Sequence, residues 1–304
     1  MTTAHPLADC LDHASPAIEL VIRARPRDLG GFSVSRLLPA ARRRLVGPFI
    51  FVDYFGPVTM PAGTGLDVRP HPHIGLATVT YLFDGEIVHR DSLGSTQVIR
   101  PGDVNWMVAG RGIVHSERTA DERRKREHGL HGVQAWLALP SDEEECAPAF
   151  FHRAQAQLPL ATRAGVTLRM IAGNGFGLTS PLAVASPTLY ADASFEAGAS
   201  LTFESEHEER ALCVVAGSLG CAADSFGPGE LVVLRPGQSL QLTASEPARA
   251  LLLGGAHLPG ERQVYWNFVS SSAERMERAK QDWRAGRFPI VPGDEVEFIP
   301  LPEG

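Results

Sequence analysis

Residues 69–118 of the chain read RPHPHIGLATVTYLFDGEIVHRDSLGSTQVIRPGDVNWMVAGRGIVHSER, and this stretch decides the fold. Its apolar runs are short, as in residues 77–83 (ATVTYLF), and they alternate with turn residues such as Gly85 and Gly102. Short runs rich in β-branched and aromatic residues between such turns are typical of antiparallel strands. The stretch therefore predicts a β-sandwich or β-barrel.

The same rhythm continues outward in both directions from this stretch. Residues 133–139 and 231–234 form further strand-like runs, and 30 glycines and 23 prolines punctuate the 304 residues. A glycine turn followed by a Pro-Gly-acid turn occurs within residues 83–104 and again within residues 215–231. This weak repeat indicates a duplicated β unit and hence an all-β protein with two domains.

The division between the two domains is expected near mid-chain. Residues 140–145 (PSDEEE) carry a proline and four acids, which we interpret as an interdomain linker, with a solvated hairpin tip as the alternative. We therefore predict an N-terminal tail at 1–20, an N-terminal metal-binding domain at 21–140 and a C-terminal domain at 141–304.

One helix is predicted late in the chain. Residues 270–272 are three serines that can cap a helix, and Met276, Ala279 and Trp283 follow as an apolar stripe before the stop signal at Gly286. We expect this helix to cover a face of a sheet.

Composition excludes several classes of partner. A net charge of −7 and an isoelectric point of about 5.9 argue against direct binding to nucleic acid, which needs clustered cations. The four cysteines show no C-x-x-C spacing, and no stretch has the pattern of a signal peptide or a membrane span. These features predict a cytoplasmic protein without a membrane segment.

Two side-chain pairs with matched spacing predict a metal site. His71 and His73 lie two residues apart at the start of a strand-like run, and His115 and Glu117 repeat that spacing. In extended chain, residues i and i+2 point to the same side, so adjacent strands could direct all four side chains at one divalent transition metal. The alternative is that the histidines are ordinary polar or core residues and that Glu117 is a surface acid.

The predicted ligand set limits the choice of ion. Three imidazole nitrogens and one carboxylate suit Fe, Co, Ni, Cu, Zn or Mn, and the absence of thiolate argues against a structural zinc site. Four protein ligands would leave two positions of a six-coordinate ion open to substrate. Four arginines flank the ligands, and we expect surface positions for them although one could steer an anionic substrate: Arg69, Arg90, Arg111 and Arg118.

The quoted stretch closely resembles the pirin family of the cupin superfamily. Residues 45–57 (LVGPFIFVDYFGP) and 266–288 (WNFVSSSAERMERAKQDWRAGRF) are also similar to bacterial pirins, so the resemblance covers the chain after about residue 20. It implies a bicupin of two β-barrel (jelly-roll) domains in which the N-terminal barrel alone holds metal.

The resemblance also implies the ligands. The family's H-P-H and H-x-E pairs match His71, His73, His115 and Glu117 without substitution, whereas the histidines after residue 140 form no such pair. Many pirins continue H-P-H-R-G-F-E, but this chain continues with residues 74–77 (IGLA), which puts in doubt any role tied to that arginine.

The function that the resemblance implies is that of a quercetin 2,3-dioxygenase. The substrates would be a small aromatic flavonol and dioxygen, Glu117 would act as the catalytic base, and iron is our first choice of ion, with Ni, Co, Cu, Zn and Mn as alternatives. A second hypothesis is a redox-sensitive regulatory protein that acts through a protein partner. A third is a cupin isomerase or lyase acting on a small acid.

Overall fold

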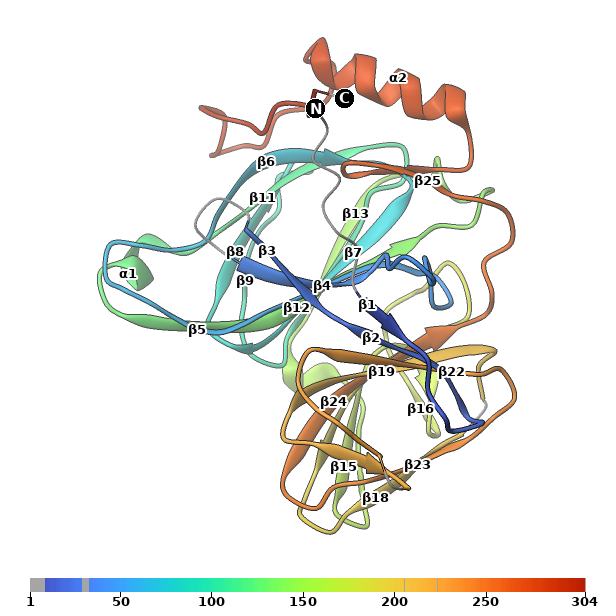
Figure 1. Ribbon diagram of the computed structural model, residues 1–304. Coiled ribbons are helices and arrows are strands. Elements are labelled where there is room, and N and C mark those ends of the chain that lie inside the picture. Colours follow the sequence, from blue (N-terminus) through green and yellow to red (C-terminus); the bar gives the residue numbers. More distant parts are fainter. Residues whose placement is uncertain (1–8, 29–32, 205, 223, 304) are drawn as a thin grey trace.

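The computed structural model describes residues 9–28, 33–204, 206–222 and 224–303, and it consists mainly of β-strands (Figure 1). Two cupin domains lie against each other, which confirms the predicted all-β bicupin. No helix of the described residues is long and apolar enough to cross a membrane.

The N-terminal domain is built from two antiparallel sheets that enclose the predicted site. Its seven-stranded sheet has the order β13 (Ala149–Arg153), β10 (Val104–Val108), β7 (Leu76–Asp84), β12 (His128–Ala138), β5 (Phe49–Met60), β4 (Ser33–Leu38) and β3 (Arg25–Asp28). The facing four-stranded sheet has the order β6 (Asp67–His73), β11 (Ile113–Arg118), β8 (Ile87–Asp91) and β9 (Thr96–Ile99). A short helix, α1 (Asp121–Arg124), connects β11 to β12.

The C-terminal domain repeats this plan. Its large sheet has the order β1 (Asp9–Leu11), β2 (Ile18–Arg23), β22 (Glu230–Leu234), β19 (Glu209–Ala216), β24 (Ala248–Gly255), β17 (Thr188–Phe195), β15 (Val166–Gly175) and β14 (Leu160–Arg163), with β16 (Leu178–Thr179) beside β15. The smaller sheet has the order β18 (Ser200–Phe203), β23 (Leu240–Thr243), β20 (Leu219–Cys221) and β21 (Asp224–Phe226).

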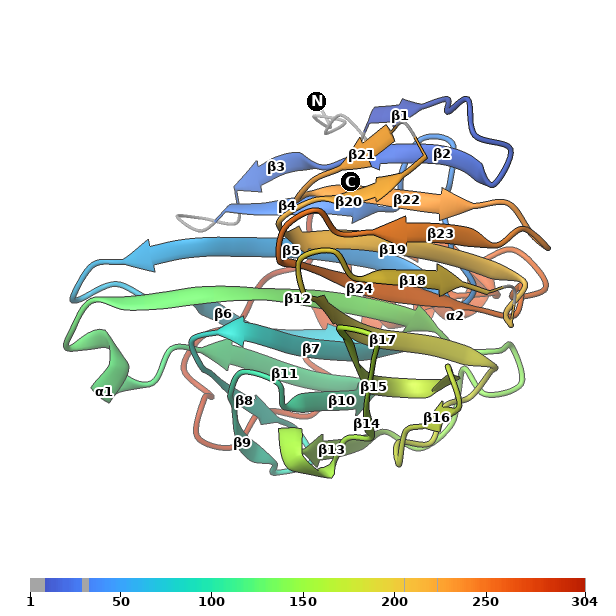
Figure 2. The same ribbon diagram turned by 90° about the horizontal axis from the view of Figure 1, so that it is seen from below.

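The two large sheets pack face to face and form the main hydrophobic core (Figure 2). Because side chains alternate along a strand, Val79 and Tyr81 of β7 face this interface, and Leu251 and Leu253 of β24 meet them from the other domain. The Tyr81 hydroxyl donates a 2.7 Å hydrogen bond to the buried Asp192 carboxylate across the interface. The other face of β7 is therefore free to line the interior of the N-terminal domain.

The strand pairing differs from the predicted domain limits at the N-terminal side. Residues 9–23 overlap most of the tail predicted at 1–20, but they form β1 and β2 in the C-terminal sheet, where Ile22 pairs with Leu231. Ile18, Leu20 and Ile22 are completely or almost completely buried, so the apolar run at 17–22 has a core position rather than a tail position.

The predicted linker at 140–145 also differs from expectation. It connects two strands of the N-terminal sheet, since β13 still pairs with β10. Glu144 within it is buried, lies 2.9 Å from Arg262 and accepts hydrogen bonds from Ser270 and Ser271. The chain crosses to the C-terminal sheet only after β13, through the short 3-10 turn Gln155–Gln157.

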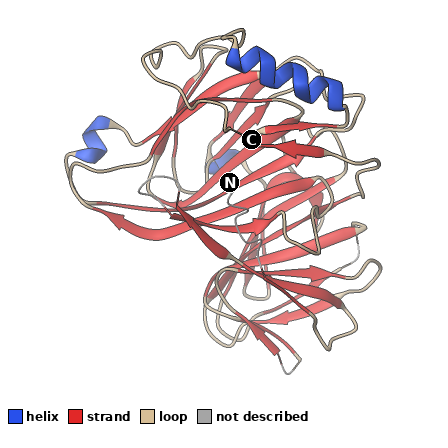
Figure 3. Cartoon of the chain, turned by 45° about the horizontal axis from the view of Figure 1, so that its top comes forward, coloured by secondary structure: helices blue, strands red, loops and turns tan. Residues whose placement is uncertain are grey.

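The predicted helix is present as α2 (Ala273–Arg284), which lies across the outside of the N-terminal domain (Figure 3). The Ser272 side chain caps it by accepting a hydrogen bond from the Arg275 amide, and Met276 and Ala279 are buried. Together with the hairpin β25 (Gln263–Tyr265) and β26 (Phe268–Ser270), α2 packs on Ile74 at the end of β6. This segment therefore belongs with the N-terminal domain, although the sequence assigned it to the C-terminal one.

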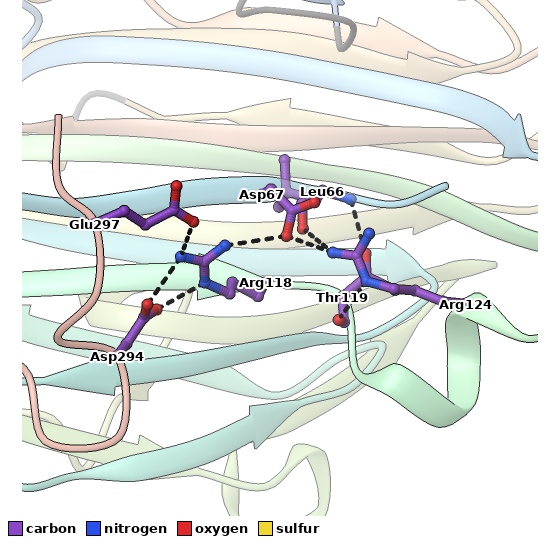
Figure 4. Close-up of polar contacts among 7 residues, drawn as sticks. All are labelled: Leu66, Asp67, Arg118, Thr119, Arg124, Asp294 and Glu297. Atoms are coloured by element: carbon purple, nitrogen blue, oxygen red, sulfur yellow. Dashed lines mark hydrogen bonds and ion pairs between the residues drawn. The ribbon is translucent and has the colours of Figure 1, made fainter. Parts of the chain in front are cut away.

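Arg118 at the end of β11 binds two acids of the segment that follows α2, Asp294 and Glu297 (Figure 4). Its guanidinium donates to both oxygens of Asp294 at 2.7 and 2.8 Å, to Glu297 at 2.9 Å and to Asp67 at 3.2 Å. Arg124 of α1 also contacts Asp67 and reaches the Leu66 carbonyl at 3.1 Å. The predicted exposed arginine is thus engaged by three acids.

Arg118→Met should release residues 290–300 from the N-terminal domain. The substitution keeps the apolar stem but leaves the mostly buried Asp294 carboxylate without its cation, and we expect a loss of about 2 kcal/mol in stability. Hydrogen exchange should show faster exchange at residues 290–300. Arg287→Met, which removes the exposed ion pair with Asp282, serves as control and should change little; equal protection in both variants would contradict the prediction.

Candidate metal centre

Three of the four predicted ligands meet at one point inside the N-terminal domain. His71 and His73 lie on β6 and His115 on the neighbouring strand β11, where His115 is directly opposite His71. The His73 and His115 Nε2 atoms are 3.1 Å apart, and one nitrogen from each of the three rings lies within 4.8 Å of the others. In the described residues this is the one group of three or more His, Cys, Asp or Glu side chains that meets this distance.

Backbone carbonyls fix the orientation of two of the rings. His71 Nδ1 lies 2.8 Å from the Arg69 carbonyl and His73 Nδ1 lies 3.2 Å from the Asn267 carbonyl. Since a carbonyl can only accept, the ring proton of each neutral imidazole is on Nδ1 and the Nε2 lone pair is left for a ligand. Asn267 lies between β25 and β26, so the segment that packs from far along the chain helps to aim a ligand.

Burial keeps the three imidazoles neutral. It lowers the pKa of His71 to about 4, and it lowers the pKa values of His73 and His115 well below the usual range, with the neighbouring rings adding to the effect. Neutral imidazole is the form that binds a metal ion, so the site requires no proton release from these rings near neutral pH. Three unprotonated nitrogens facing one another suit a cation, and these three histidines can therefore hold a metal ion.

Glu117 lies on the same face of β11 but outside the three-nitrogen cluster. A register shift between His115 and Glu117 pairs Glu117 with Val68 of β6. Its carboxylate accepts hydrogen bonds from Gln134 Nε2 at 2.9 and 3.0 Å and from Thr80 Oγ1 at 3.1 Å. The role of Glu117 as a fourth ligand stays a prediction.

The environment of Glu117 raises the proton affinity of its carboxylate. Burial raises the pKa of this carboxyl above its ordinary value, while the hydrogen bonds from Gln134 and Thr80 oppose the shift. A carboxylate with a raised pKa is a better proton acceptor at neutral pH than an exposed one. Gln134 and Thr80 come from the facing sheet and carry no motif in the sequence, so only the fold reveals them.

A cavity of about 40 Å³ adjoins Glu117. It is lined by Val34, Asp53, Phe55, Leu66, Val68, Thr80, Ile87, Glu117 and Gln134. This volume is enough for about one water molecule and well below the several hundred Å³ of typical small-molecule sites. A larger substrate can bind here only if lining side chains move.

The interior of the C-terminal domain differs in character. Its core cluster contains apolar side chains such as Met170, Phe195, Leu212 and Leu252 in the place where the N-terminal domain has its polar group. Its described histidines form no cluster: His207 contacts the Asn174 carbonyl, His257 is largely exposed beside Glu209, and His13 lies beside Asp224 and Phe226. The fold is thus repeated, but the site is not.

Comparison with known proteins agrees with this geometry. Residues 31–137 match the family model described as Pirin, and residues 190–289 match the one described as Pirin C-terminal cupin domain. A pirin-like protein of Caulobacter vibrioides is 47% identical over 94% of this chain and 100% of its own length. The chain belongs to the pirin family.

Other relatives of this pirin carry the name of an enzyme. A Pseudomonas aeruginosa protein named "Putative quercetin 2,3-dioxygenase" is 38% identical over 97% of this pirin and 94% of its own length. The crystal structure of a quercetin 2,3-dioxygenase from Acinetobacter baumannii superposes with a TM-score of 0.87 at 31% identity, covering 93% of this pirin and 95% of that chain.

The metal centre predicts a simple loading experiment. The purified pirin should bind one divalent transition metal ion per chain, as measured by elemental analysis after dialysis. His115→Ala should strongly reduce loading because it removes one of the three imidazoles that converge on the ion. His257→Ala, which removes an exposed histidine of the other domain, should load fully; equal metal content in the two variants would place the ion elsewhere.

Proposed function

We propose that this pirin is a metal-dependent dioxygenase that cleaves the ring of a flavonol, with Fe as the first candidate ion. The observation that carries the proposal is the convergence of three buried, neutral imidazoles beside a buried carboxylate of raised pKa. Names of relatives add to it, since a 31% identical structure is that of a quercetin 2,3-dioxygenase. The residues that we assign to the ion are His71, His73 and His115, with Glu117 as the fourth ligand.

In this proposal Glu117 is the general base that accepts a proton from the substrate. A bound first-row ion would supply Lewis acidity toward the flavonol oxygens and an electron path to dioxygen. Glu117 would accept the proton of the flavonol 3-hydroxyl, and Gln134 and Thr80 would hold its carboxylate in place before and after the transfer. The enclosed interior would exclude bulk water from the activated substrate.

The size of the interior imposes a condition on this function. A cavity of about 40 Å³ does not admit a flavonol, so Phe55, Leu66 or their neighbours must shift when substrate binds. Such opening costs free energy and would reduce the apparent affinity for substrate.

Glu117→Gln tests the proposed base. We expect flavonol-dependent oxygen uptake by the metal-loaded protein to fall by about 10²- to 10⁴-fold in kcat, the usual contribution of a general base. Glu196→Gln, an exposed acid of the C-terminal domain, is the matched control and should keep its rate. Absence of oxygen uptake by the metal-loaded unsubstituted protein with every flavonol tried would refute the dioxygenase proposal.

A second candidate function is metal-dependent binding of a protein partner. Arg118 follows Glu117 directly in β11 and holds the segment that carries the exposed Val296 and Phe298, which are 99% and 59% exposed. A change in the charge of the ion would thus occur close in sequence to Arg118, whose ion pairs hold the exposed apolar segment in place.

Affinity capture with oxidised and reduced iron-loaded protein tests this second function. Recovery of a partner in one state and its loss with Val296→Asp would support it. Leu160→Asp alters an exposed apolar residue of the other domain and serves as control. Equal recovery in both redox states would argue against a redox switch.

A further inference from the structure

Two buried residues of β8, His89 and Asp91, lie beside His115 on the strand next to β11. Antiparallel pairing of β8 with β11 sets Asp91 opposite His115 and His89 opposite Glu117. His89 Nδ1 lies 3.4 Å from His115 Nδ1, and His89 Nε2 lies 3.0 Å from Asp91 Oδ2. His89 is 3% exposed and Asp91 is fully buried, so water does not compete for these contacts.

Asp91 accepts at one end of the hydrogen-bonded series Asp91–His89–His115, and this determines which ring nitrogens of the two histidines carry protons. A carboxylate only accepts hydrogen bonds, so the proton between Asp91 and His89 is on His89 Nε2. In the tautomer of His89 that carries its single ring proton on Nε2, Nδ1 is an acceptor, so the proton between the two rings is on His115 Nδ1. The remaining nitrogen of His115, Nε2, is therefore unprotonated, and this is the atom that faces His73.

The surroundings hold both groups in place. The His89 ring stacks on Phe150 with a centroid distance of 4.3 Å and an interplanar angle of 12°. The other Asp91 oxygen, Oδ1, accepts backbone hydrogen bonds from Leu93 at 2.9 Å and Ser95 at 3.1 Å. Since these backbone hydrogen bonds fix the Asp91 carboxylate, its second oxygen, Oδ2, has a fixed position toward His89 Nε2.

We propose that Asp91 and His89 are positioning residues that set the tautomer and ring orientation of His115 for the metal ion. The inference rests on the metal binding in the proposed function and extends it by two residues that do not contact the ion. His71 and His73 are oriented by backbone carbonyls, whereas His115 is oriented by this side-chain relay. Partners of this kind typically change metal affinity by about 10- to 100-fold.

Asp91→Asn is the sharpest variant. Its amide oxygen can keep the backbone hydrogen bonds of Leu93 and Ser95, while its NH₂ group would face His89 Nε2 and donate to it. The proton of His89 would then move to Nδ1 and donate to His115, which would carry its own proton on Nε2, where it blocks a metal ion. His89→Phe is the second variant; it keeps the stack on Phe150 but removes the acceptor for His115 Nδ1–H.

Cobalt affinity and ring tautomers are the measurements. We expect the Co²⁺ dissociation constant, from titration followed by visible absorption, to rise by about 10- to 100-fold in each variant. Two controls should bind Co²⁺ as the unsubstituted protein does: Asp192→Asn, a buried acid at the domain interface, and His131→Phe, a partly buried histidine beside Tyr54. Nitrogen-15 NMR of the metal-free, unsubstituted protein should show His115 protonated on Nδ1.

The outcomes separate this inference from the proposed activity. His115 protonated on Nε2 in the metal-free protein, or unchanged Co²⁺ affinity in both variants when circular dichroism shows them folded, would overturn it. Unsubstituted protein that binds Co²⁺ but, loaded with iron, consumes no oxygen with flavonols would refute the dioxygenase alone. Failure of the unsubstituted protein to bind any Co²⁺ would remove both.

Discussion

The pairing of β6 with β11 in one register is the constraint on which the metal centre depends. Because side chains alternate along a strand, a slip of one residue would turn His115 away from His71 and His73. The register changes between His115 and Glu117, where Arg69 and Pro70 of β6 lie against Ser116 alone, and Pro70 has no backbone N–H for a ladder hydrogen bond. That irregularity separates Glu117 from the three rings and brings its carboxylate to Gln134 and Thr80 of the facing sheet.

A repeated fold with two different interiors localises the chemistry. In the N-terminal domain, inward positions hold histidines, Glu117, Thr80, Asn105 and Gln134, each of them paired with another polar group. In the C-terminal domain, the equivalent space is filled by an apolar cluster, which needs no polar partners and adds hydrophobic stabilisation. The second domain thus contributes a packing surface for the outer face of strands β5, β7 and β12.

The sequence predicted much of this structure where local signals are strong. Turn spacing and apolar runs indicate an all-β chain, and the i, i+2 histidine pairs identify three side chains that do meet. His89 and Asp91 have the same i, i+2 spacing, yet nothing local shows that β8 lies beside β11. The domain limits differ because strand partners such as Ile22 and Leu231 are set by pairing over two hundred residues, which composition does not encode.

The exchange of segments between the domains has a consequence for how the protein is made. Strand β2 pairs locally with β1, but its other edge has no partner until β22 has been synthesised, and His73 lacks its carbonyl acceptor until Asn267 has been synthesised. Each domain therefore needs segments from distant parts of the chain to complete its fold, and most contacts join residues that are far apart in sequence, which slows folding. Completion of the ligand cluster is consequently a late event in folding, and a polypeptide terminated before Asn267 would carry an incomplete site.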